Sequence, residues 1–147
     1  MIAAALNFIS NQLDSFLKRK TSSTNSLVKL SGLVNLDGSI AVTEENILVL
    51  TVVNIAEEST IANQPFSASH GSTILKNAPP VYINVSLLIS AVFTEKQYAT
   101  GLHNLSLAIK FFQQNPYFAS EQTAMPIGID KLSFELVHLD VDTMSRF

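Results

Sequence analysis

The segment from Pro79 to Phe118 limits most strongly what this chain can fold into. From Val81 to Phe93, apolar residues alternate with mixed ones, which predicts a strand with one apolar face. Apolar residues then recur every three or four positions, which predicts an amphipathic helix that ends at Asn115-Pro116. The apolar face of this helix would consist of Tyr98, Leu102, Leu105, Ile109 and Phe112. Other parts of the chain, or a partner, must cover the apolar faces of the strand and the helix.

Shorter patterns predict the elements that pack against this unit. They are, in chain order, a helix with an apolar stripe from Ile2 to Leu17, a strand from Leu27 to Leu36 broken at Ser31-Gly32, a hairpin turn at Asp37-Gly38 leading into Ile40 to Val42, a strand from Ile47 to Ile55 buried on both faces, and a strand from Lys131 to Leu139. Together they predict an α+β (mixed α/β) fold with a central, mostly antiparallel sheet of four to five strands flanked by two main helices.

The chain carries little charge for a free monomer. Only 14% of its 147 residues are charged and 47% are hydrophobic, whereas roughly 25% charged residues is usual in soluble domains. A partner that covers apolar surface would explain this, and so would a weakly charged monomer with a large core. The net charge of -3 argues against nucleic-acid binding, which needs a basic surface. Lys18, Arg19 and Lys20 fit a solvated helix end better than a phosphate site.

The sequence also limits where the protein works. No apolar run reaches the roughly 18 residues that a membrane span needs, and the first residues lack the basic start of a signal peptide. We therefore expect a protein without membrane contact that is made in the cytoplasm. Cysteine is absent, which excludes disulfides and thiolate metal ligands.

No pattern of catalytic residues is present. His70, His103 and His138 lack the spacing of metal ligands, and no Gly-x-Ser-x-Gly nucleophile motif occurs. The run Ser69-His70-Gly71-Ser72 lies in a long connection, where neighbouring positions do not fix the geometry of a base and a nucleophile. We therefore expect no enzymatic activity, no cofactor and no metal site.

One segment partly matches a calcium-binding motif. Asn35, Asp37, Gly38 and Glu44 occupy positions of an EF-hand loop. The first position, normally Asp, is Leu33, and strand patterns flank the segment in place of helices. A β-hairpin turn is therefore the better interpretation.

Two pairs of residues beside the predicted strands and helix suggest contact surfaces. Glu57 and Glu58 leave a buried strand and open a connection of more than 20 residues that contains His70, and connections of this length are often functional. Tyr117 and Phe118 follow the helix end, where aromatic side chains often anchor a contact, although core packing is the alternative for both. We predict Glu57, Glu58, His70, Tyr117 and Phe118 as interface residues.

The order of these features resembles a known family. The sequence pieces are MI-x-x-AL-x-F-I, ILVLTVVNIAEES, PPVYINVSLLISAVF, a Tyr-x-x-x-Leu-x-x-Leu helix, FFQQNPYF and LSFELVHLD. The most specific are the turn at Asn54 to Glu58, Ile83-Asn84-Val85, and Phe111-Phe112-x-x-Asn115-Pro116. Over nearly its whole length, the chain is similar to the cap, or tail-terminator, family of extracellular contractile injection systems of the antifeeding-prophage type.

The resemblance implies a structural role. Six copies would form a ring, a homohexamer, that meets the inner tube protein and the sheath protein at the distal end of a phage tail-like particle. Family members continue with an aromatic-containing helix and a further strand, whereas this chain ends at Phe147. Residues 1–147 would therefore be a single tail-terminator-like domain that lacks this C-terminal segment. The particle, assembled in the bacterial cytoplasm, could be released from the cell.

Two alternatives fit the sequence less well. One is a tail terminator or tail-completion protein of a contractile phage, which would perform the same task in another particle. The other is a small ligand-binding or hydrolase domain that uses the connection around His70, which would require that connection to fold over a defined pocket.

Overall fold

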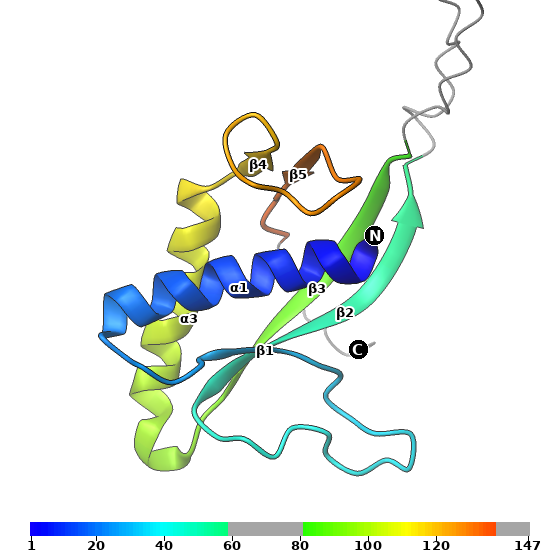
Figure 1. Ribbon diagram of the computed structural model, residues 1–147. Helices are drawn as coiled ribbons and strands as arrows, with labels where there is room; N and C mark the ends of the chain where they lie inside the picture. The colour runs from blue at the N-terminus through cyan, green and yellow to red at the C-terminus, as the bar shows by residue number, and fades with distance from the viewer. Residues whose placement is uncertain (59–80, 138–147) are drawn as a thin grey trace, which may run out of the picture. The chain divides into compact units, whose positions relative to one another are not determined.

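The computed structural model describes residues 1–58 and 81–137 (Figure 1). The chain divides into two compact units. The first unit consists of Met1–Thr51 and Leu88–Phe147, and the second unit consists of Val52–Leu87. The predicted functional residue His70, together with His138 and the end of the strand expected at Lys131 to Leu139, lies outside the described residues.

Helix α1, Ile2–Thr21, confirms the first predicted helix. Its buried apolar side chains lie along the predicted stripe: Leu6, Ile9, Leu13, Phe16 and Leu17. Ser22 ends the helix in the left-handed conformation, at φ 55°, and the Thr21 hydroxyl donates to the carbonyl of Leu17 at 2.7 Å. Asp14 ties the helix to the next segment, because its carboxylate accepts the Leu27 N–H at 2.7 Å and pairs with Lys18 at 3.0 Å.

The described strands form a three-stranded sheet and a separate two-stranded one. The first has the order β1 (Val28–Leu30), β2 (Ile47–Glu57) and β3 (Ile83–Val92). The second pairs β4 (Tyr117–Ala119) with β5 (Lys131–Ser133) in antiparallel fashion. The α+β class and the two main helices are therefore confirmed.

The sheet differs in detail from the prediction of four to five mostly antiparallel strands. Strand β1 runs parallel to β2, with Val28 opposite Leu48, while β2 and β3 run in opposite directions (Figure 1). The parallel pair forms because residues 31–46 are long enough to carry the chain back to the start of the ladder. The last described strand is short and joins β4, so the central sheet has three described strands.

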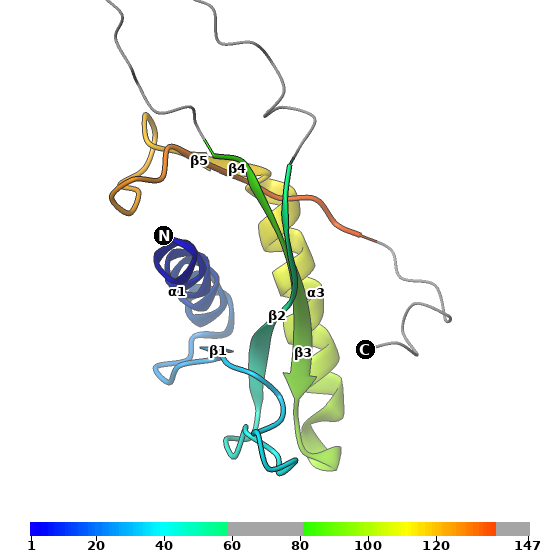
Figure 2. The ribbon, with the colours of Figure 1, turned by 90° about the vertical axis from the view of Figure 1, so that its right-hand side faces the viewer.

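The first four residues of β2, Ile47–Leu50, are buried on both faces, whereas the burial predicted as far as Ile55 is wrong for the second half of the strand, where Asn54–Glu57 are exposed. Leu48 and Leu50 face the main core, where side chains from both helices meet. Ile47 and Val49 face a smaller cluster that includes Val42 from the segment before the strand. Figure 2, which looks nearly along α1, shows that helix on one side of the strands. The helices thus cover one face of β2 at Ile47–Leu50, and the 33–42 segment covers the other.

Helix α3, Tyr98–Gln114, follows a short 3-10 helix at Glu95–Gln97. Its predicted apolar face is wrong for three of the five residues, since Tyr98 is 67%, Leu102 49% and Ile109 43% exposed. The helix instead buries Gly101, Asn104, Ala108 and Phe111. We call Tyr98, Leu102 and Ile109 the α3 stripe.

Close packing explains which face of α3 is buried. A Cβ atom on Gly101 would lie 2.8 Å from Cδ2 of Phe93, so only glycine lets the helix approach the end of β3 this closely. Ala108, one of the smallest side chains, occupies the same face. Small residues thus let α3 pack closely at Gly101 and Ala108, while the larger residues of the α3 stripe stay exposed.

Candidate interaction surfaces

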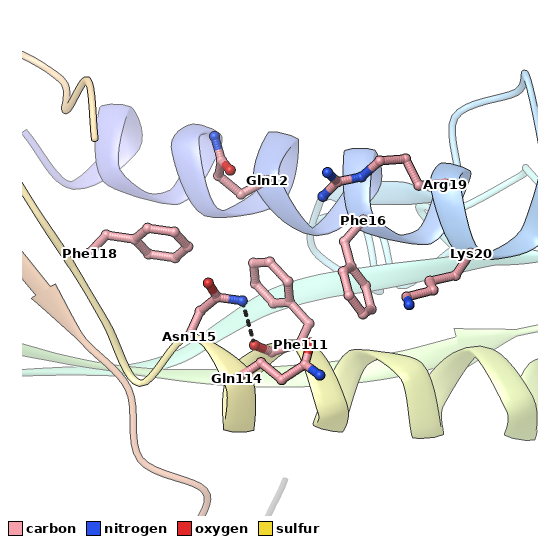
Figure 3. Close-up of a pocket in the computed structure, with 8 residues that line it drawn as sticks. All are labelled: Gln12, Phe16, Arg19, Lys20, Phe111, Gln114, Asn115 and Phe118. Atoms are coloured by element: carbon pink, nitrogen blue, oxygen red, sulfur yellow. Dashed lines mark hydrogen bonds between the residues drawn. The ribbon is translucent and has the colours of Figure 1, made fainter. Parts of the chain in front are cut away.

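The first unit has an open pocket of about 420 Å³ where the second half of α1 meets the end of α3 (Figure 3). Its floor is aromatic, because Phe16, Phe111 and Phe118 line it and are themselves largely buried. The ring centroids of Phe16 and Phe111 are 5.4 Å apart, and those of Phe111 and Phe118 are 6.2 Å apart. We call this cavity the α1–α3 pocket.

The rim of the α1–α3 pocket is polar and positively charged. Arg19 and Lys20 come from the last turn of α1, and the Lys20 ammonium lies 5.7 Å from the centroid of the Phe16 ring. Amide side chains complete the rim, and the Asn115 amide donates to the carbonyl of Phe111 at 2.9 Å (Figure 3). None of the described residues that line the pocket is a carboxylate. A pocket of this kind suits an anionic group attached to an apolar one.

The 35–39 turn confirms the predicted hairpin. Val34 and Ile40 form an antiparallel bridge, and the Asn35 N–H donates to the carbonyl of Ser39 at 2.8 Å. Gly38 adopts φ +85°, which glycine reaches without strain. Side-chain hydrogen bonds fix the turn further, because the Ser39 hydroxyl donates to Asp37 at 2.6 Å and the Ser39 N–H donates to the same oxygen at 2.9 Å.

These contacts account for the acidic residues that matched the EF-hand pattern. The Ser39 hydroxyl, followed by the Ser39 N–H, holds the pKa of Asp37 below its ordinary value. Glu44 instead pairs with the Lys29 ammonium at 2.7 Å, and this hydrogen bond lowers the pKa of Glu44. The two carboxylates serve separate local contacts.

The two predicted interface aromatics lie side by side in β4 and differ in burial. Tyr117 is exposed, and the Lys131 ammonium lies 4.9 Å from the centroid of its ring. Phe118 is buried in the chain's own core, where its ring packs edge-on against Phe8 and Phe134. Successive residues of a strand point to opposite faces, which explains the difference. Core packing, the alternative for both aromatics, therefore applies to Phe118, whose ring also forms a wall of the α1–α3 pocket.

The predicted acidic pair lies in the second unit. Glu57 is exposed at the end of β2. The Glu58 N–H donates to the carbonyl of Tyr82 at 3.0 Å, and the Glu58 carboxylate accepts from the Asn84 amide at 2.9 Å. The interface role of Glu57, Glu58, Tyr117 and Phe118 stays a prediction, as does that of His70.

Sequence reasoning missed the α1–α3 pocket and the exposure of the α3 stripe. The signal for the pocket was the Lys18-Arg19-Lys20 cluster, which was interpreted as a solvated helix end. Lys18 fits that interpretation, since it pairs with Asp14, but Arg19 and Lys20 line the cavity. The aromatic floor brings together residues about a hundred positions apart in sequence, so no local sequence pattern predicts it.

The described residues contain neither a metal-binding cluster nor a membrane-spanning helix. Across residues 1–58 and 81–137, no group of three or more His, Asp or Glu side chains converges as a metal site would require. No helix within the same ranges has the length and apolar character needed to cross a membrane.

Comparison with known proteins identifies a family. A family model described as the Pvc16 N-terminal domain matches residues 6–147. A comparison with curated proteins found no match.

Proposed function

We propose that this chain, which belongs to the Pvc16 N-terminal domain family, caps an injection particle of the Photorhabdus virulence cassette type. In this proposal six copies form a ring at the distal end. The ring sits on the inner tube, meets the last layer of the sheath, and ends the growth of both. The role is structural and involves no catalysis.

The observation that carries the proposal is the α3 stripe. Tyr98, Leu102 and Ile109 recur with the spacing of one helix face, yet all three are exposed in the single chain. Exposed apolar residues that share one face of a helix are typical of a surface covered by another protein. A tube subunit, a sheath subunit or a neighbouring copy would each supply such cover.

The proposal is tested by the length of assembled particles. Cells that lack this chain should produce tubes of uncontrolled length, measured by electron microscopy of purified particles. Supplying the wild-type chain should restore one uniform length. Particles of normal length in its absence would contradict the proposal.

Substitutions in the α3 stripe test the surface itself. Leu102→Ser combined with Ile109→Ser should remove the chain from purified particles, because serine cannot replace the buried apolar area. The matched control is His103→Ser with Lys110→Ser, one position further along the same helix, where both side chains are also exposed. The control should assemble normally, whereas equal incorporation of both variants would rule out the α3 stripe as a contact.

A further inference from the structure

The 35–39 turn presents an unusual pair of side chains to solvent. Leu36 is fully exposed, at 111% of its reference area, and Asp37 beside it is exposed as well. The hydrogen bonds from Ser39 to Asp37 and between Asn35 and Ser39 hold the turn in one shape. An apolar residue kept in water on an ordered turn loses little further conformational entropy when it binds, which is the property of a pre-organised anchor.

The α1–α3 pocket has the opposite character. Within the described chain, neither Arg19 nor Lys20 has a carboxylate partner, because Asp14 on α1 pairs with Lys18 and the other described ion pair joins Lys29 to Glu44. Beneath the two cations lies the aromatic floor. The pocket therefore offers positive charge above apolar surface, and the turn offers a carboxylate beside an apolar side chain.

The two features cannot meet within one copy. Both belong to the first unit, and Figure 1 shows the segment between β1 and β2 well away from the end of α1 that follows Phe16. A contact between them must join one copy to the next. Two different surfaces then meet, which is the heterologous arrangement that generates a ring when the rotation between copies closes.

We propose that the 35–39 turn of one copy inserts into the α1–α3 pocket of its neighbour. The Asp37 carboxylate lies between Arg19 and Lys20, and Leu36 packs on the ring of Phe16. Each copy gives one turn and receives one, so the contact repeats around the ring until it closes. This inference rests on the ring proposed above and names the surfaces that hold it together.

Engineered disulfides test the contact directly, because the chain contains no cysteine. The variant carrying both Leu36→Cys and Gln12→Cys places one thiol on the turn and one on the pocket rim. Mild oxidation of assembled particles, or of concentrated chain, should produce a ladder of covalent oligomers that ends at the closed ring. Each single variant should give no species larger than a dimer. A double variant that gives no more oligomer than the single variants would overturn the proposal.

Charge exchange gives a second, independent readout. Asp37→Lys should raise the dissociation constant for self-association at least about tenfold, measured by analytical ultracentrifugation, because a like charge would face the two cations. Arg19→Glu with Lys20→Glu should do the same, and the chain with all three changes should regain association. Glu95→Lys, the same charge change in the short 3-10 helix before α3, is the control and should associate normally.

The outcomes separate this inference from the proposed function. Rings that form normally with Asp37→Lys overturn the turn-and-pocket contact and leave the cap in place. Particles of uniform length that contain no ring of this chain overturn both.

Discussion

The two main helices follow the same hydrophobic period and use it differently. In α1 the apolar stripe predicted from sequence is the buried one, and Leu13 and Leu17 are completely inaccessible. In α3 three of the five residues of the predicted stripe are exposed, and the buried residues are Gly101, Asn104, Ala108 and Phe111. A period of 3.6 residues shows that a helix has an apolar face. It does not show whether that face is covered by the same chain or by another one.

The largest change in stability should come from a substitution in the buried stripe of α1. Leu17→Ala should lower the free energy of unfolding by about 2–5 kcal/mol, because it removes a fully buried side chain and leaves a cavity in the main core. Urea unfolding followed by circular dichroism would measure the change. Ser15→Ala, at an exposed position on the same helix, is the control and should hardly change the free energy of unfolding.

A smaller loss is expected where α3 packs through glycine. Gly101→Ala would push a methyl group against Phe93 at 2.8 Å, and overpacking of this kind costs about 1–3 kcal/mol. The higher helix propensity of alanine, about 1 kcal/mol, offsets part of that loss. A stabilised Gly101→Ala variant in the same urea experiment would show that α3 does not approach β3 as closely as described.

The α3 stripe should affect stability least of the three helix sites. Leu102→Ser should change the free energy of unfolding by about 0.5 kcal/mol or less, since its side chain is already half exposed. The same variant should associate more weakly with its partner. The substitution would then weaken assembly while leaving the stability of the fold nearly unchanged. A large loss of stability would instead place Leu102 in the chain's own core.

The smallest effect on stability is expected in the 35–39 turn. This turn is held by hydrogen bonds and not by a core. The pKa of Asp37 is below its ordinary value of 3.8, so the carboxylate stabilises the folded turn above pH 3.8. This contribution disappears as the pH falls through the lowered value. Ser39→Ala should raise the pKa of Asp37 toward 3.8, measured by NMR titration of the carboxyl carbon. An unchanged pKa would show that the hydroxyl does not hold the turn.

Local patterns predicted the elements well because their causes are local. The stripe of α1, the turn at Asp37-Gly38 and the buried strand at Ile47 each depend on residues close together in sequence. The parallel pairing of Val28 with Leu48 and the choice of face on α3 depend on distant contacts, such as that of Gly101 with Phe93. No short pattern encodes such contacts.

The interaction surfaces were harder to predict for the same reason. The Lys18-Arg19-Lys20 cluster was visible, but the pocket exists only because α1 crosses the end of α3 near Phe118. Tyr117 and Phe118 were recognised as a pair, and only the strand pairing of β4 with β5 decides which of them is buried.

The burial of Ile47–Leu50 on both faces of the strand has a consequence for hydrogen exchange. The Leu48 N–H donates to the carbonyl of Leu27 at 2.8 Å, and the Ser31 N–H donates to the carbonyl of Leu50 at 3.1 Å. Amide protons in such a place exchange with solvent only when the surrounding unit unfolds, whereas those at exposed ends exchange by local fraying. In hydrogen-exchange experiments this strand segment should therefore be the last to take up deuterium. Its protection against exchange would report the free energy of unfolding of the first unit.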